Sequence, residues 1–406
     1  MIKKLRLKNF LSYKDTTINF NDFNVVLGAN ASGKTNLTKA LLSLYNFIIN
    51  GFQTLDDFDA FAETIFNKNI SEQESLVIEI VLSDEIEIPL LPPLPKNEKI
   101  IVEEQHYQLE LALGKGVVSE KYWLKLKGKN TPFHVLDRTE NQAKYTFDYA
   151  PNFSSCLKNE LDANSLKLLK YQLLAGKSYS GFLVIMYQSF CEHFFTYILN
   201  YQNLILPFSS RNQTLLSYDG SNLSGVLEYY KKHNKQVIND INEILKRNIP
   251  NFEYLDTKSM GIGTFYFIVH ERDGQDYGLR ELSEGTVLFI GLVTAMVSCQ
   301  YLEIKKGQKG IFIIEEPEKN LHPQLMEEIV ALAKSLTDKF QVIITTHSTD
   351  LVAHLNIEDI ILLDKNETGT RLQRIKKTEE LERYLEEFSL DQIWLNNDLG
   401  GGTING

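Results

Sequence analysis

The sequence predicts an α/β fold in which a mostly parallel sheet is covered on both faces. Short apolar runs at 310–314, 341–345 and 359–363 are separated by stretches with helical spacing, which is the alternation typical of such a sheet. A fourth apolar run, 23–27, ends in glycine, and apolar residues at helical spacing follow Lys34. A strand, a loop and a helix are therefore expected early in the chain.

Other segments have their own patterns. Strand patterns are found at 2–10, Leu76–Leu82, His106–Leu113, Val117–Leu126 and 263–270. Residues 160–250 are predicted to be mainly helical, with the clearest helix from Val226 to Asn248. We expect four segments: residues 1–130 with the glycine loop and an antiparallel β subdomain, 131–255 as a helical lobe or insertion, 256–372 as the rest of the main domain, and 373–406 as a C-terminal helix with a flexible tail.

Composition favours a folded protein in a reducing compartment. The 406 residues are 43% hydrophobic and 23% charged, so a sizeable core can be buried. The three cysteines form no CxxC pair, which argues against a disulfide scaffold or a zinc knuckle. The basic amino terminus is not followed by a signal-like apolar stretch, and the most membrane-like run, Phe182–Pro207, contains Glu192 and His193. A cytoplasmic protein without a membrane partner is expected.

The loop Gly28-Ala29-Asn30-Ala31-Ser32-Gly33-Lys34-Thr35 has the G-x-x-x-x-G-K-[ST] pattern. Glycines let the backbone curl so that successive N–H groups point at phosphate oxygens, and the helix amino terminus adds partial positive charge. Lys34 is expected to reach the β- and γ-phosphates, and the Thr35 hydroxyl to bind Mg²⁺. The sequence therefore predicts a nucleoside triphosphate site here.

Three later stretches complete a candidate site. The apolar run 311–314 ends in Glu315 and Glu316, where a first acid can support Mg²⁺ and a second can polarise an attacking water. The run 341–345 is followed by His347, 31 residues after Glu316, a spacing that favours contact with the γ-phosphate. Residues 281–286 (Glu-Leu-Ser-Glu-Gly-Thr) open an apolar helical stretch; alone they indicate only a capped helix.

This ordered set resembles the ABC-type ATPases, and more closely their RecF/SMC-like branch with the related bacterial ATPases. The opening Leu5–Tyr13, the segment Glu315–Pro323 with its Leu-His-Pro end, and the shorter stretches Asp219–Leu223 and Ile393–Asn396 are further similarities. The resemblance implies a P-loop NTPase head with a mixed central sheet, an antiparallel β subdomain and a helical lobe.

The resemblance also implies roles for single residues. Glu316 would be the catalytic base and His347 the switch histidine, while Thr35 and Glu315 would hold Mg²⁺. Ser283 and Gly285 would contact ATP bound to a second copy, and Glu318–His322 would link the two sites of the dimer. The residues expected to contact ATP are Gly28, Asn30, Ala31, Ser32, Gly33, Lys34, Thr35, Asn36, Ser283 and Gly285.

Two positions depart from the family pattern, and one element is not placed. The first acid is Glu315 where aspartate is commoner, and Glu284 stands where transporters usually have glycine. For the glutamine of the Q-loop, Gln188 and Gln213 are only candidates.

The implied function is an ATP-hydrolysing switch that works as a homodimer with ATP between its heads. Relatives with this architecture often serve in anti-phage or abortive-infection systems beside a nuclease or toxin, so a separate effector partner is expected. The alternative is a RecF-like DNA repair ATPase. The net charge of −11 lies mostly in residues 71–110, with ten acidic and two lysine residues, so composition neither supports nor excludes DNA.

Two further functions are less favoured. A transporter subunit is disfavoured because 246 residues separate Thr35 from Leu282. Asp57-Phe58-Asp59 has the form of a TOPRIM metal pair, but no apolar strand precedes it, and we interpret it as a surface loop.

Overall fold

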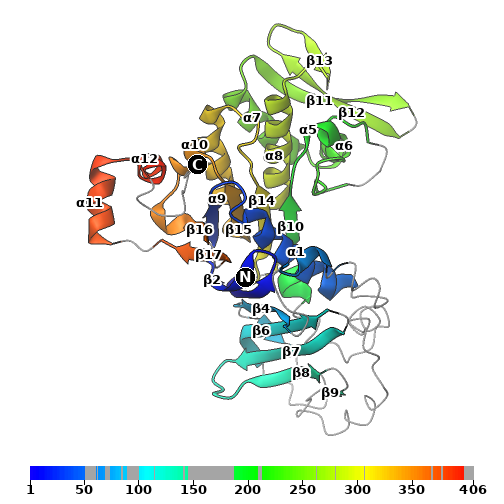
Figure 1. Cartoon of the computed structure of the whole chain (residues 1–406). Coiled ribbons are helices and arrows are strands. Elements are labelled where there is room, and N and C mark those ends of the chain that lie inside the picture. The colour runs from blue at the N-terminus through cyan, green and yellow to red at the C-terminus, as the bar shows by residue number, and fades with distance from the viewer. Residues whose placement is uncertain are drawn as a thin grey trace.

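The computed structural model of the chain is shown in Figure 1. It describes residues 1–50, 61, 63–68, 74–83, 86–88, 100–113, 115–139, 142–144, 187–208, 213–261, 263–278, 280–305, 307–366, 369–375 and 378–396. Within these residues no helix is long and apolar enough to cross a membrane.

A six-stranded sheet forms the middle of the molecule. Its order is β10 (Phe194–Tyr197), β14 (Gly310–Glu315), β15 (Phe340–Thr346), β3 (Phe23–Leu27), β16 (Ile360–Asn366) and β17 (Gly369–Arg374). The first five strands are parallel and β17 pairs antiparallel with β16. The sheet is therefore mixed, as expected, and the apolar runs predicted as its strands are confirmed.

An antiparallel sheet lies on one side of this middle layer, at the bottom of Figure 1. Its order is β2 (Tyr13–Asn19), β1 (Ile2–Phe10), β4 (Leu76–Leu82), β6 (Ile100–Ala112), β7 (Gly116–Leu126), β8 (Phe133–Thr139) and β9 (Gln142–Lys144), and β5 (Ile86–Ile88) pairs with β6. The predicted antiparallel β subdomain is thus present.

Helices cover both faces of the middle sheet and form the remaining lobes. The α-helices with described bounds are α1 (Lys34–Asn50), α5 (Tyr201–Leu204), α6 (Leu223–His233), α7 (Lys235–Asn248), α8 (Glu284–Gln300), α9 (Met326–Ser335), α10 (Thr349–Val352), α11 (Glu379–Glu387) and α12 (Leu390–Leu395). Shorter turns are a π-helix, η2 (Tyr187–Cys191), and two 3-10 helices, η3 (Pro323–Leu325) and η4 (Ile357–Asp359).

The middle sheet separates two hydrophobic cores. Val25 and Leu27 of β3 pack into one core together with α8, whereas Val26 between them packs into the other core together with α1. Alternate residues of a strand face opposite sides of a sheet, so this division is what a buried parallel strand requires. Helices α1 and α8 consequently lie on opposite faces of the sheet.

Two details of the predicted helical segment are wrong. The single helix expected over Val226–Asn248 is broken at Asn234, whose backbone is not helical (φ −149°, ψ 86°) and whose side chain accepts a hydrogen bond from the Gln236 N–H. Asparagine favours such a cap over a helix interior, so α7 begins anew there.

The second correction concerns strands. β8, β9 and β10 lie within residues 131–255, where helices were expected. The run Phe194–Tyr197 is aromatic and β-branched, and it pairs along its whole length with β14 at the edge of the middle sheet. Strand pairing of this kind outweighs a local helical pattern. The four segment limits themselves stay predictions.

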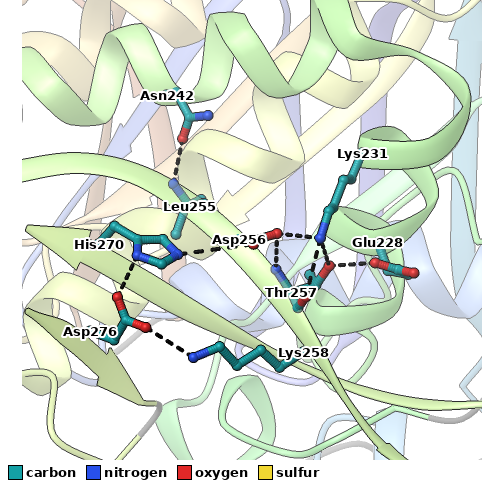
Figure 2. A network of polar contacts seen from close by, with 9 residues as sticks. All are labelled: Glu228, Lys231, Asn242, Leu255, Asp256, Thr257, Lys258, His270 and Asp276. Atoms are coloured by element: carbon teal, nitrogen blue, oxygen red, sulfur yellow. Dashed lines mark hydrogen bonds and ion pairs between the residues drawn. The ribbon is translucent and has the colours of Figure 1, made fainter.

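A third sheet is formed by β11 (Phe252–Gly261), β12 (Thr264–Glu271) and β13 (Asp276–Gly278), and a polar network shown in Figure 2 fastens it to the helices. Asn242 of α7 accepts the Leu255 N–H at 2.8 Å, and Glu228 of α6 accepts the Thr257 hydroxyl. Within the sheet, Lys258 pairs with Asp276 at 2.9 Å. The network holds this sheet against α6 and α7.

Candidate active site

The ends of three neighbouring strands bring the predicted site residues together. In the parallel register Leu27 of β3 lies opposite Thr346 of β15, and Thr345 lies opposite Glu315 of β14. Gly28, Glu316 and His347 are the next residues along these strands, so they emerge at one edge of the sheet. Ligands of open α/β sheets bind outside this carboxyl edge.

The phosphate-binding loop is tightly curled between β3 and α1. Ala31 (φ 61°) and Gly33 (φ 116°) have left-handed backbone, which turns successive N–H groups the same way. Lys34 is only 5% exposed and donates hydrogen bonds to the carbonyls of Gly28 (2.8 Å) and Ala29 (3.0 Å). The ammonium therefore lies across the mouth of the loop, where phosphate oxygens are expected to bind.

A clasp made by the β1–β2 turn and by β17 holds this loop, and sequence reasoning missed it. Thr370, which is buried, donates its hydroxyl to the Ser32 carbonyl at 2.9 Å, and the Tyr13 hydroxyl donates to the Gly33 carbonyl at 2.8 Å. The Asn36 amide donates to Ser12 Oγ at 2.9 Å. The Thr370–Ser32 contact joins residues 338 positions apart, and the other two span 20 and 24 positions, so no local sequence pattern predicts them.

The same neighbours leave no room for side chains at the loop glycines. A Cβ on Gly33 would approach Ser12 Oγ to 2.8 Å, and one on Gly28 would approach Leu363 Cβ to 2.8 Å. Both glycines are thus required by space, and Gly33 also by its φ angle.

Burial and charge oppose each other at Lys34. Burial lowers the pKa of the Lys34 ammonium, while the negative charges of Glu316, Glu318 and Glu315 raise it. Phosphate oxygens would add further negative charge beside the ammonium, so they favour its charged form.

Glu315 has the environment of a metal ligand. Burial raises the pKa of its carboxyl group, and the neighbouring Glu316 charge adds to this. Its Oε1 atom is buried and has no hydrogen-bond partner within the described residues. Mg²⁺ takes carboxylate and hydroxyl oxygens as ligands. Glu315 and the exposed hydroxyl residue Thr35 at the start of α1 therefore fit a Mg²⁺ ion.

Glu316 and His347 face each other beyond the sheet edge. His347 Nδ1 lies 3.5 Å from Glu316 Oε1, and the two side chains are 41% and 36% exposed. Glu316 has left-handed backbone (φ 47°), fixed by a 2.8 Å bond from its N–H to the Thr345 carbonyl. Such strain in a non-glycine residue gathers at functional sites.

A third acid, Glu318, belongs to the same cluster. Its Oε1 accepts hydrogen bonds from the Thr346 hydroxyl (2.7 Å) and the His347 N–H (3.1 Å). The resemblance assigned Glu318 only to a dimer-linking loop, yet its side chain points into the site of its own copy. The acid-rich turn Glu315–Glu318 after β14 was the sequence feature that could have indicated this role.

The stretch Glu281–Thr286, here called the signature stretch, is well formed and contacts the loop after β14. Ser283 is exposed and caps α8 by accepting the Thr286 N–H at 3.1 Å. Glu284 Oε1 accepts a hydrogen bond from Asn320 Nδ2 at 2.7 Å. Ser283 and Lys34 lie at the amino-terminal ends of helices α8 and α1, which pack on opposite faces of the sheet.

The remaining sequence candidates are resolved in part. Gln213 accepts a hydrogen bond from Asn222 at 3.0 Å, which ties it to the turn before α6, and Gln188 lies in η2. These contacts do not identify either glutamine as the Q-loop residue. Asp57 and Asp59 lie outside the described residues.

Fold and site together define a P-loop ATPase of the ABC/SMC-head type. The chain belongs to the AAA ATPase domain family, which it matches over residues 1–215. Residues 192–353 also match a second family, described as "AAA domain, putative AbiEii toxin, Type IV TA system".

Individual relatives agree with this assignment. The Septu protein PtuA of Bacillus thuringiensis is 26% identical over 172 residues, which are 41% of this chain and 42% of that protein. The chain thus spans less than half the length of this curated relative. Two solved structures share the fold at 16% identity and a TM-score of 0.53. They are an SMC head bound to the C-terminal winged-helix domain of ScpA (94% of this chain, 99% of that one) and the Pyrococcus furiosus SMC head with an extended coiled coil bound to the C-terminal domain of ScpA (95% and 98%).

Proposed function

We propose that this protein binds and hydrolyses ATP with Mg²⁺ and works as a conformational switch. The observation that carries the proposal is the convergence of Lys34, Glu315, Glu316 and His347 on one edge of the sheet. A phosphate-binding loop, a metal-ligating acid, a second acid and a histidine are the parts that ATP hydrolysis uses.

Each part has a chemical task. Lys34 and the loop N–H groups bind the β- and γ-phosphates, and Thr35 and Glu315 hold Mg²⁺, which neutralises phosphate charge. Glu316 accepts a proton from water as the water oxygen attacks the γ-phosphorus, and the bond to the β-phosphate oxygen breaks to leave ADP. His347, which lies beside Glu316, orients the γ-phosphate.

The complete site requires a second copy of the chain. Ser283 is exposed and caps α8, which packs on the face of the sheet opposite α1. A head-to-tail dimer brings Ser283 and Gly285 of each copy to the ATP of the other. The γ-phosphate then stabilises the closed dimer and its removal opens it.

The biological setting is inferred from similarity. We propose a cytoplasmic defence ATPase that acts with a separate effector protein. Two similarities support this: the relative PtuA is a Septu protein, and the description of the second matching family names a toxin and a type IV TA system. The ATP-driven movement of the dimer would control that effector.

Two variants and mass measurement on sizing test the proposal. Glu316→Gln keeps the nucleotide contacts but lacks the base, so ATP should trap it as a dimer that does not turn over. Lys34→Ala should lose ATP affinity and remain unchanged in mass when ATP is added. The control is Glu327→Gln, an exposed acid at the start of α9, which should behave as the wild type. The proposal fails if the wild type does not hydrolyse ATP and its mass on sizing does not change when ATP is added.

DNA binding stays an alternative prediction, suggested by the fold that the chain shares with SMC heads. It requires duplex affinity that rises with ATP and falls steeply as salt increases. An affinity that does not respond to salt removes it.

A further inference from the structure

The switch histidine is held by a carboxylate that no motif assigns to catalysis. Glu318 follows Glu316 by two residues, and its side chain is only 8% exposed. One oxygen, Oε1, binds the Thr346 hydroxyl and the His347 backbone N–H, and lies 3.4 Å from His347 Nδ1. The other oxygen, Oε2, is buried without a hydrogen-bond partner within the described residues.

A carboxylate is buried at considerable cost unless hydrogen bonds and charges compensate for it. Glu318 has two donors on one oxygen and acts on the Lys34 ammonium, whose pKa its charge helps to raise. The acid is therefore a buried neighbour of the histidine, and its charge reaches the lysine expected to bind the γ-phosphate.

The contacts explain how His347 is oriented. The imidazole is 41% exposed, so packing alone restrains it little. Its Nδ1 lies beside two carboxylates, Glu318 at 3.4 Å and Glu316 at 3.5 Å. Carboxylate oxygens only accept hydrogen bonds, so a hydrogen bond from the ring to either acid requires the proton on Nδ1.

The two acids have unequal freedom. Glu316 is 36% exposed and, as the base, must turn to a water molecule during hydrolysis, whereas Glu318 is buried and anchored. When the Glu316 carboxylate turns away from the His347 imidazole, the Glu318 carboxylate still lies beside the imidazole.

We propose that Glu318 is a positioning residue that fixes the orientation and proton position of His347 and so frees Glu316 to act as the base. This inference rests on the function proposed above. It makes Glu318, the third glutamate of the Glu-Glu-Pro-Glu turn, a part of the hydrolytic site of its own copy, in addition to any contact with a second copy.

The test compares Glu318→Ala with Glu318→Gln. Glutamine keeps an oxygen that accepts from Thr346 and the His347 N–H, whereas alanine removes every contact. We expect kcat to fall about 10- to 100-fold in the alanine variant while KM for ATP changes less than about threefold, as for a lost general acid–base arrangement. The glutamine variant should regain most of the activity.

A readout independent of turnover completes the experiment. Nitrogen-15 NMR of the nucleotide-free protein, with His347 assigned by a His347→Asn variant, should show the proton on Nδ1 in the wild type and a changed signal in Glu318→Ala. Glu327→Gln should leave the signal in place.

The outcomes separate this inference from the proposed function. An unmoved His347 signal, or equal kcat in Glu318→Ala and wild type, overturns the positioning role. If alanine and glutamine lower kcat and melting temperature together, Glu318 is merely structural, and the inference also fails. If the signal moves but the wild type does not hydrolyse ATP, the ATPase proposal fails while the role of Glu318 in orienting His347 stands.

Discussion

Asn320 Nδ2 donates a 2.7 Å hydrogen bond to Glu284 Oε1, and this bond joins the loop after β14 to the first residue of α8. Asn320 has left-handed backbone (φ 59°), a conformation that asparagine tolerates better than most residues. Glu284, which departs from the transporter pattern, therefore supplies the acceptor of this hydrogen bond. A glycine at the same position would have no side-chain acceptor. The acid-rich turn and the signature of one copy are linked directly.

Replacing Glu284 by alanine should loosen the signature helix. An exposed hydrogen bond contributes about 1 kcal/mol, which corresponds to roughly a fivefold change in an equilibrium constant. We expect the ATP-bound dimer of Glu284→Ala, measured by sedimentation in the Glu316→Gln background, to dissociate about fivefold more readily. ATP affinity of the single copy should stay unchanged. Glu284→Gln retains the acceptor, and a weakened dimer in that variant would contradict this explanation.

Gly285→Ala tests how closely the same two segments pack. A Cβ at Gly285 would lie 2.5 Å from the Asn320 carbonyl oxygen, so the backbone of the loop must move. Helix propensity alone favours alanine by about 1 kcal/mol. We nevertheless expect slower hydrolysis, by about tenfold or more, because the displaced loop includes Glu318. Gly278→Ala, where the nearest contact is 3.4 Å, is the control and should retain activity; equal rates for both variants would rule out the effect.

Sequence alone was sufficient for the parts of the site that local patterns encode. Apolar strands followed by Gly28, Glu315 and His347 identify the sheet edge, because parallel strands end on the same side. The contacts of Thr370 with Ser32 and of Glu284 with Asn320 were not predictable, since they join residues 338 and 36 positions apart and depend on tertiary packing. The start of α7 was not predicted either. Asn234 caps this helix, but the helical spacing of apolar residues continues across the break between α6 and α7.

Thr370→Val should weaken ATP binding through the phosphate-binding loop, because the Thr370 hydroxyl binds the Ser32 carbonyl of that loop. The substitution keeps the size of a side chain that is 2% exposed but removes its bond to the Ser32 carbonyl. Leaving a buried acceptor unpaired costs about 1–3 kcal/mol, part of which appears as a less ordered loop. We expect ATP affinity, measured by calorimetry, to fall about fivefold. Thr337→Val removes a 2.7 Å bond to the Lys334 carbonyl far from the site and should not change ATP affinity. Equal affinities in all three proteins would exclude a role for the clasp.

Glu315→Gln should stabilise the nucleotide-free protein, and the effect should depend on pH. Burial raises the pKa of the Glu315 carboxyl above its ordinary value of 4.5. Below 4.5 both folded and unfolded states are protonated, so wild type and variant differ little. As pH rises through the folded pKa, the buried charge forms and the wild type loses stability relative to the variant. At neutral pH the variant should melt about 1–3 °C higher.

The same pair of proteins tests whether Glu315 binds the metal. Glutamine has a weaker oxygen ligand, so Mg²⁺ with ATP should raise the melting temperature of the wild type more than that of Glu315→Gln. The order of stabilities at neutral pH should then reverse once Mg²⁺ and ATP are saturating. Glu327→Gln, an exposed change of the same charge, should show neither the pH-dependent gap nor the reversal. A gap that is constant from acid to neutral pH would mean that the Glu315 charge is not the cause, because only an ionising carboxyl group makes the difference vary.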